Sequence, residues 1–332
     1  MASIPLGPLG TQSPLSAALI TVGAITAVSI TYTLVRFVAS TFLLPGTPLS
    51  TFGPKGSWAV VTGASDGIGK EFALQLARKG FNLVLVSRTQ SKLEALAKSI
   101  EGVEVETLAI DFSKPTETDY VHLENVLGGK QVAVLINNVG QSHSIPVPFN
   151  ETDTGELQNI IQINCMGTLR VTQTTLPHML PQKKGLILTM GSFAGLTPTA
   201  LLATYSGSKA FLQAWNNALA TELAPQGITC YLIHGYLVTS AMSKIRRSSW
   251  LIPSEKVFVK SALAKIGRRG GSLGFTYSGT PYWSHALFAF VVTGASLASD
   301  FSQKVVYGIN RTMHVDIRRR ALRKAERDGK KL

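Results

Sequence analysis

The sequence predicts an α/β fold with a doubly wound parallel sheet that follows one apolar N-terminal segment. Apolar runs of five or six residues alternate along the chain with stretches of helical periodicity, which is the pattern of repeated βαβ units. Helical crossovers keep such strands parallel, so their carboxyl ends are expected to share one edge of the sheet. Glycine and polar residues follow several of the runs, which places a candidate site at that edge.

The expected organisation is an N-terminal region over 1–50, one α/β domain over 51–280 and a C-terminal region over 281–332. About 240 residues remain without the N-terminal region and the tail, enough for a single core. The first expected strand begins at Trp58, and the others span Asn82–Ser87, Val105–Ile110, Val132–Ile136, Leu186–Met190 and Ile228–Ile233. The expected helices span Gly67–Lys79, Ser91–Ile100, Thr116–Leu127, Asp153–Leu180 and Tyr205–Ala224.

A glycine-rich turn follows the first strand. The strand that begins at Trp58 runs into Gly63, Gly67 and Gly69, and a helical pattern comes next. Glycines let the backbone approach a phosphate closely, and the unpaired amides at the start of a helix attract its charge. A lone glycine triplet also fits an ordinary tight turn, so the phosphate site depends on what the neighbouring strands carry.

The residues after the next strands indicate which dinucleotide binds. Arg88 follows the second strand, about twenty residues past the turn, where an acidic residue would bind the ribose hydroxyls of NAD. An arginine pairs instead with the extra 2′-phosphate of NADP, so the sequence favours NADPH. Asp111 ends the third strand, and Asn138 and Gly140 follow the fourth, at the same edge of the sheet.

Three further polar residues suggest redox chemistry. Ser192 follows the fifth strand, and Tyr205 and Lys209 lie four residues apart, on one face of an expected helix. A tyrosine ordinarily titrates near ~10, so it shuttles protons at neutral pH only when a nearby cation lowers its pKa. A tyrosine and lysine at this spacing also occur on solvated helix faces. The pair therefore gains weight only together with the glycine turn and Ser192.

Together these features resemble the short-chain dehydrogenase/reductase family, in which a Gly-x-x-x-Gly-x-Gly turn, an Asn-Asn-x-Gly strand end and a Ser, Tyr, Lys triad recur in this order. The resemblance covers residues 57–239 and implies a Rossmann-type fold. It implies that Tyr205 is the general acid and that Lys209 lowers its pKa and binds the ribose. Ser192 would anchor the substrate carbonyl oxygen, and Asn164 would take part in a proton relay.

The same resemblance implies the residues that bind the cofactor. They lie in the glycine turn, at strand ends and in the catalytic helix: Gly63, Ser65, Asp66, Gly67, Ile68, Gly69, Arg88, Asp111, Asn138, Gly140, Tyr205, Lys209, Val238 and Thr239. One departure follows the sixth strand, where the family usually has Pro-Gly and this chain has His234 and Gly235. We expect His234 to be a packed, hydrogen-bonded residue rather than a catalytic base.

A narrower resemblance concerns the substrate. Residues 86–93, 203–209 and 236–247 resemble the microsomal branch of the family, whose members reduce very-long-chain 3-oxoacyl-CoA in fatty-acid elongation or reduce 17-ketosteroids. This implies NADPH-dependent formation of a (3R)-3-hydroxyacyl-CoA, with other elongation enzymes as partners, and a 17-ketosteroid reductase as the alternative. An idle membrane scaffold is a third hypothesis, but a scaffold has no need of the intact triad.

The first fifty residues predict a membrane anchor. Leu15 to Val35 carries no charged side chain, is followed by Arg36 and is long enough to span a bilayer. A cleaved signal peptide is the competing interpretation, but no basic segment precedes the run and no clear cleavage site follows it. Because Arg36 and Lys55 lie after the run, the positive-inside tendency places the catalytic domain in the cytosol. With the family resemblance, this predicts a single-pass protein of the endoplasmic reticulum.

The net charge of +13 is concentrated in the C-terminal part of the chain. Residues 244–270 carry eight basic side chains and one acidic, and residues 304–332 carry ten and three. Neither zone shows a nucleic-acid motif and no metal-ligand pattern is expected, so coenzyme A and lipids are the expected partners. Lys244, Arg246 and Arg247 fall in a substrate lid expected at about 236–270, where they would meet coenzyme A phosphates or anionic lipid headgroups.

The C-terminal region contains a second apolar stretch, Trp283 to Ala298. Its sixteen residues are short for a membrane span, and a crossing would carry the basic residues 318–320 to the lumen. We therefore expect a packed or membrane-dipping helix followed by a basic tail. Residues 329–332 do not complete a dilysine retrieval signal. Cys165 and Cys230 fall in the expected core and indicate no disulfide framework.

Overall fold

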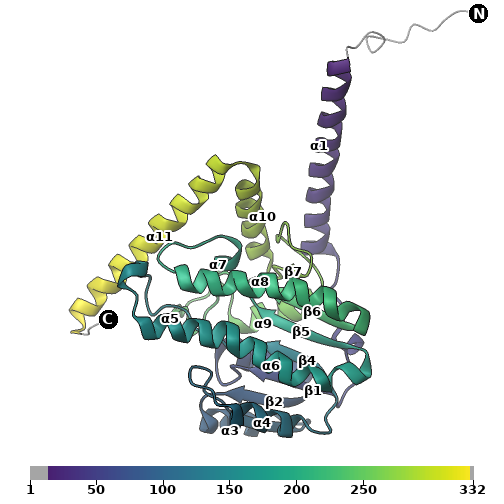
Figure 1. The fold of residues 1–332 in the computed structure, drawn as a ribbon, viewed down its shortest axis with the longest axis vertical. Coiled ribbons are helices and arrows are strands. Elements are labelled where there is room, and N and C mark those ends of the chain that lie inside the picture. The colour runs from purple at the N-terminus through teal and green to yellow at the C-terminus, as the bar shows by residue number, and fades with distance from the viewer. Residues whose placement is uncertain (1–13, 330–332) are drawn as a thin grey trace, which may run out of the picture.

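A computed structural model describes residues 14–329. Its centre is a sheet of parallel strands in the order β3-β2-β1-β4-β5-β6-β7 (Figure 1). The strands span Trp58–Thr62 (β1), Asn82–Ser87 (β2), Val105–Ala109 (β3), Val132–Asn137 (β4), Gly185–Met190 (β5), Ile228–Ile233 (β6) and Ser278–Gly279 (β7). The expected doubly wound sheet is confirmed. Only the short β7 was not expected, because it has no apolar run to indicate it.

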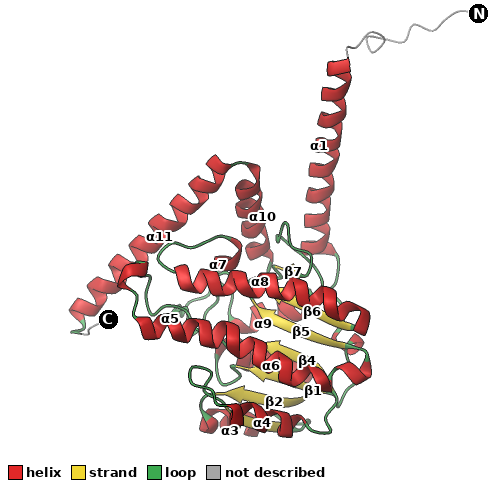
Figure 2. Cartoon of the chain, viewed as in Figure 1, coloured by secondary structure: helices red, strands yellow, loops and turns green. Residues whose placement is uncertain are grey.

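Helices cover both faces of this sheet (Figure 2). One face packs against α2 (Gly67–Arg78), α3 (Gln90–Lys98) and α9 (Glu255–Ala264), and the other against α4 (Glu117–Leu127), α6 (Thr168–Thr175) and α8 (Ala203–Leu223). The central strands are largely apolar because both of their faces are buried, whereas the edge strand β3 carries Glu106 and Thr107 and is only partly buried. In β1, for example, Ala59 and Val61 join one hydrophobic cluster and Val60 joins the other.

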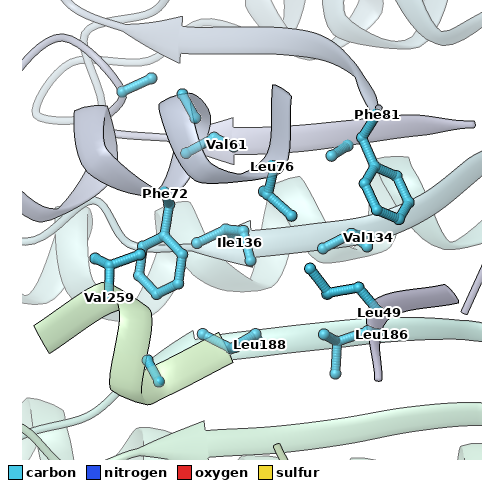
Figure 3. Packing of buried hydrophobic residues seen from close by; sticks show 14 of the residues in the cluster. Leu49, Val61, Phe72, Leu76, Phe81, Val134, Ile136, Leu186, Leu188 and Val259 are labelled. Carbon is cyan, nitrogen blue, oxygen red and sulfur yellow. The ribbon is translucent and has the colours of Figure 1, made fainter. Parts of the chain in front are cut away.

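Figure 3 shows the first of these clusters, in which helix and strand side chains interlock. Phe72 and Leu76 of α2 and Val259 of α9 are fully buried against the sheet. The α9 contact matters for the site because α9 follows the long loop after β6. Packing of α9 on α2 therefore fixes the far end of that loop.

The strand order reverses between β1 and β4, which are neighbours although β2 and β3 intervene in the sequence. Crossover helices leave these two strands on opposite sides of the sheet, so a crevice opens at their carboxyl ends. Dinucleotides bind at this position in open α/β sheets. The glycine turn after β1 and Asn138 after β4 both lie at this reversal.

The helix expected over Asp153–Leu180 is interrupted. The structure has α5 (Thr154–Ile161), a π-helical turn at Gln162–Gly167, α6, and two short 3-10 turns at Leu176–His178 and Leu180–Gln182. Pro177 and Pro181 end regular helical bonding because each lacks a backbone N–H. The π turn carries Asn164, and such turns occur frequently at functional sites.

The apolar N-terminal segment forms α1 (Pro14–Val38), which continues as a π-helical turn to Leu43. Its most apolar window is not buried at all, and Figure 1 shows α1 projecting from the body of the protein. By length and composition α1 is a candidate membrane anchor. The expected helix is confirmed, and it extends three residues past Val35.

The C-terminal region forms two helices in place of a helix and a tail. α10 (Trp283–Ala298) has the expected bounds, and α11 (Asp300–Arg327) is a 28-residue helix that turns back across the body (Figure 1). Asn310 of α11 donates a hydrogen bond to Thr199, and Arg318 bonds to the Pro146 carbonyl. Sequence periodicity did not reveal α11 because its contacts with the body are polar as well as apolar. The retrieval-signal residues 330–332 lie outside the described part of the chain.

Candidate active site

The glycine turn between β1 and α2 has the geometry of a phosphate cradle. Gly63 and Gly67 have φ of +65° and +53°, a region that favours glycine. At Gly69 any Cβ would collide with the Gly63 carbonyl, so the helix packs closely against the turn. Asp66 caps α2 by accepting a hydrogen bond of 2.7 Å from the Gly67 amide. Ser65 and Ile68 complete the turn, which leaves the N-terminus of α2 facing the crevice.

Thr62, which the sequence analysis did not single out, locks the two central strands together. Its Oγ1 accepts hydrogen bonds from the amides of Asn138 and Val139, at 3.0 and 3.1 Å. The Asn138 side chain donates in return to the Thr62 carbonyl at 3.0 Å. Gly140 follows, and a Cβ there would lie 3.3 Å from Asn164 Oδ1 and 3.6 Å from Lys209 Nζ. The segment after β4 therefore reaches α8, the helix that carries Lys209.

Two charged residues flank the crevice on the β2–β3 side. The exposed Arg88 follows β2, and Asp111 follows β3. Hydrogen bonds from Ser113 hold the pKa of Asp111 below its ordinary value, with smaller contributions from Arg88 and Lys114. Asp111 is thus a carboxylate near the Arg88 guanidinium, and the guanidinium remains free to meet a phosphate.

Ser192 and Tyr205 form a hydrogen bond, although they belong to two different helical segments. Ser192 is the N-cap of α7 (Phe193–Leu196), where its Oγ accepts a hydrogen bond from the Ala194 amide at 3.2 Å. Burial raises the pKa of Tyr205, and a hydrogen bond to Ser192 lowers it by a smaller amount. The Tyr205 pKa therefore lies above its ordinary value, opposite to the lowering expected from Lys209, because burial of the phenol outweighs the bond to Ser192. Tyr205 is protonated at neutral pH, which is the state that a general acid needs.

Lys209 lies one turn after Tyr205 in α8. Its side chain is buried, and Nζ donates a hydrogen bond of 2.8 Å to the Met190 carbonyl at the end of β5. Nζ lies 5.8 Å from the centroid of the Tyr205 ring. Burial lowers the pKa of Lys209 to about 8. The ammonium therefore keeps its charge at neutral pH, with little margin, beside the phenol.

Asn164 is fully buried, but its side chain is occupied by structural bonds. Oδ1 accepts from the Gln141 amide at 2.7 Å, and Nδ2 donates to the Gln141 carbonyl and to Ser208 Oγ, each at 2.9 Å. Both amide hydrogens are therefore used. Asn164 ties the loop after β4 to α8, and its role in a proton relay stays a prediction.

His234 is fully buried directly after β6 and contacts the backbone of Ser192. Its ring Nδ1 lies 3.2 Å from the Ser192 carbonyl, and its amide donates to the Gly279 carbonyl of β7 at 2.9 Å. Burial lowers the pKa of His234 to about 4, so the ring is neutral and Nδ1 is the donor. A proline at this position would lack the amide that bonds β7. The packed role expected for His234 agrees with this geometry, and the link to Ser192 is new.

The loop after β6 covers the glycine turn. Val238 and Thr239 are buried, and Thr239 Oγ1 donates to Glu255 of α9 at 2.8 Å. Ser240, the next residue, lies over Gly67: a Cβ added at Gly67 would be 3.7 Å from the Ser240 Cβ. The lid expected at 236–270 therefore divides into two parts. The loop before α9 lies over the crevice, whereas α9 itself packs in the hydrophobic core.

An aromatic cluster closes the site on the side of the C-terminal helices. The ring of Phe193 stacks on Phe288 of α10 at 5.5 Å, and Tyr236 lies 5.0 Å from Phe288. The Tyr236 hydroxyl points at the sulfur of Met313 in α11, 3.7 Å away. Apolar side chains from three distant segments therefore meet next to Ser192.

Comparisons with known proteins identify the family. Residues 57–249 match the family model of the short chain dehydrogenases. A short-chain dehydrogenase from Sphingobium yanoikuyae in complex with NADPH has a similar structure, with a TM-score of 0.56, 27% identity and coverage of 62% of this chain and 83% of that one. The chain belongs to the short-chain dehydrogenase family, whose members use a nicotinamide cofactor.

Relatives that match nearly the whole chain are more specific. A very-long-chain 3-oxoacyl-CoA reductase of Aspergillus clavatus is 58% identical over 97% of this chain and 94% of the relative. Proteins of the same name in Aspergillus terreus and Pyrenophora tritici-repentis are 57% and 56% identical, over 97% and 90% of this chain and 92% and 88% of theirs. The similarity extends through α1 and α11, beyond the family core.

We predict that His234→Ala lowers kcat while leaving the KM for NADPH unchanged. The substitution leaves the Ser192 carbonyl without its buried donor, at a cost of about 1–3 kcal/mol in the free energy of unfolding. Steady-state kinetics and thermal unfolding measure the two effects. His234→Asn retains a donor and should restore part of kcat; equal losses in both variants would contradict the positioning role.

The pKa of Lys209 predicts an alkaline limb in the reaction rate. The ammonium is present below about pH 8 and is lost as the pH rises through that value, so kcat should fall above it. A pH profile of NADPH oxidation with saturating substrate measures this. In Lys209→Arg, the residual rate should lack the same limb because a guanidinium stays charged. A wild-type rate that is unchanged one unit above that pH would contradict the assignment.

Proposed function

We propose that this protein reduces long and very-long-chain 3-oxoacyl-CoA to (3R)-3-hydroxyacyl-CoA with NADPH, in the fatty-acid elongation cycle. The observation that carries the proposal is the meeting of Ser192, Tyr205 and Lys209 at the carboxyl edge of the sheet. The names of near full-length relatives support the substrate class. The stereochemistry rests on the family resemblance.

The site fits a nicotinamide dinucleotide. The crevice at the strand reversal has a helix N-terminus and a glycine turn for the pyrophosphate. Lys209 uses one ammonium hydrogen on Met190, which leaves two for ribose hydroxyls. Arg88 is exposed directly after β2, and an arginine at this strand end supports NADPH over NADH.

The protein's own groups account for the proton and for the position of the carbonyl. When bound, the nicotinamide supplies a hydride to the carbonyl carbon of the substrate. Tyr205 donates its proton to the carbonyl oxygen, and Ser192 donates a hydrogen bond to the same oxygen. These donors face the charge that develops on the oxygen, which stabilises the transition state. The Lys209 ammonium stabilises the Tyr205 phenolate that remains.

The cover over the site suits a thioester with a long chain. The aromatic cluster of Phe193, Tyr236 and Phe288 offers an apolar wall beside Ser192. Lys244 Nζ donates a hydrogen bond of 2.9 Å to the Ser144 carbonyl, which joins the loop after β6 to the loop after β4. With Arg246 and Arg247 it forms a basic rim for coenzyme A phosphates.

The exposed helix α1 supports attachment to a membrane, and the positive-inside tendency supports a cytosolic catalytic domain. The endoplasmic reticulum follows from the proposed role in elongation. Other elongation enzymes would then be partners in the same membrane. Such an arrangement keeps an apolar acyl chain out of water between successive reactions.

The proposed reaction predicts a strong dependence on Tyr205. Loss of the general acid in Tyr205→Phe should lower kcat by about 10²–10⁴-fold, with little change in stability because only a hydroxyl is lost. The measurement is NADPH oxidation with 3-oxostearoyl-CoA, beside estrone as a 17-ketosteroid, with Tyr277→Phe as the matched control. Near-normal turnover in Tyr205→Phe would contradict the mechanism. Turnover of estrone alone would assign the site to ketosteroids.

Arg88→Asp tests the choice of cofactor. The substitution removes the cation proposed for the 2′-phosphate, a charged bond of about 1.5–3 kcal/mol, so the KM for NADPH should rise on the order of 10- to 100-fold. The KM for NADH should fall or stay constant. Lys92→Asp changes the same charge at a nearby exposed position and serves as the control. Equal effects in the two variants would show that only the general field matters.

A further inference from the structure

Contacts join the end of α1, and the segment that follows it, to the body of the protein. Phe37 at the end of α1 stacks on Phe290 in the middle of α10, with ring centroids 4.3 Å apart. Lys265 Nζ donates to the Leu44 carbonyl at 2.8 Å, and Arg268 Nε donates to the Pro45 carbonyl at 2.7 Å. The direction of α1 is thus fixed relative to the body. A membrane that contains α1 must meet one particular face of the protein.

The hairpin of α10 and α11 rises on that face. In Figure 1, α10 runs beside the lower end of α1, and its tip points the same way as α1. The tip lies about seven residues past Phe290, a rise on the order of 10 Å beyond the stacked rings. An equal rise along α1 from Phe37 reaches Ile30, so the tip lies level with the apolar part of α1.

The hairpin of α10 and α11 exposes large apolar side chains in the second half of α10 and at its tip. Leu297 and Phe301 at the tip are 71% and 77% exposed, and Val291 is 58% exposed. The opposite face of α10 is packed, with Ala286 and Ala289 fully buried. The exposed side chains are therefore no part of the protein core. Several strongly exposed large apolar side chains on one hairpin indicate a site of contact.

A cavity at the foot of the hairpin suits a phosphate. It has a volume of ≈ 160 Å³ and is lined by Arg36, Arg269 and the small residues around Ser272. No carboxylate in residues 14–329 forms an ion pair with either guanidinium. Two like charges share this space at the end of α1, the depth at which lipid phosphates lie.

We propose that the α10–α11 hairpin is a second membrane-binding element, whose tip enters the interfacial layer of the bilayer that α1 crosses while Arg36 and Arg269 hold a phospholipid phosphate. The proposal rests on the membrane attachment proposed above. The exposed tip supplies the apolar contact and the arginine cavity supplies the charge. Because Phe288 of the same hairpin lies in the aromatic cluster beside Ser192, the hairpin joins the active-site wall to the membrane surface.

Depth measurements on the full-length protein in phospholipid nanodiscs test the proposal. Single cysteines at Leu297→Cys and Phe301→Cys carry an environment-sensitive fluorophore, and the native Cys165 and Cys230 are buried and resist labelling. Val22→Cys in α1 is the membrane control, and Val121→Cys in α4 is the aqueous control. We expect blue-shifted emission and quenching by shallow nitroxide lipids at the tip, quenching by deep nitroxide lipids at Val22, and neither at Val121.

The controls separate the possible failures. An aqueous tip with α1 in the bilayer overturns the hairpin proposal alone, whereas an aqueous α1 overturns the proposed attachment and the hairpin with it. A tip that is shielded from water but not quenched by nitroxide lipids indicates a protein partner and also overturns the proposal. For the cavity, native mass spectrometry should show retained phospholipid that is reduced in Arg36→Gln with Arg269→Gln. Equal retention in the wild type and this variant overturns the phosphate assignment.

Discussion

The buried ammonium of Lys209 is the constraint on which the rest of the site depends. A lysine is rarely buried without partners, because desolvation disfavours its charge, and here burial brings its pKa down to about 8. The Met190 carbonyl offsets part of that cost and ties α8 to the end of β5. Gly140 lets the backbone after β4 pass close to the same nitrogen. The position of the Lys209 ammonium thus fixes where α8, the end of β5 and the segment after β4 meet. Tyr205 lies one turn before Lys209 in α8.

Both the hydroxyl and the carbonyl of Ser192 are held by hydrogen bonds. Its hydroxyl faces Tyr205 and caps α7, and its carbonyl bonds to the neutral ring of His234. Phe193 carries the same segment into the aromatic cluster with α10. Ser192 is therefore connected through His234 to the sheet and through Phe193 to the C-terminal hairpin. This connection gives α10 and α11 a structural reason to lie over the site.

Sequence reasoning predicted the parts that depend on local patterns. The strands, the glycine turn, the apolar α1 and the bounds of α10 follow from periodicity and turn chemistry. The contacts of Thr62 and His234 were not predicted, because they join residues far apart in the sequence and neither residue type is diagnostic. The π turn at Asn164 leaves no mark in the periodicity. A basic tail was expected in place of α11, because the many charged side chains of this segment are typical of a solvated tail. The roles of Asn164 and of the cofactor residues stay predictions from the family resemblance.

The fate of a single transferred hydride tests the proposed reaction. The purified protein would be mixed with NADPH that carries deuterium on the transferred position, and with a long-chain 3-oxoacyl-CoA, for one turnover. Mass spectrometry of the product then locates the label. We expect one deuterium at C3 of a (3R)-3-hydroxyacyl-CoA. A product without deuterium at C3, or no product from the thioester, would contradict it.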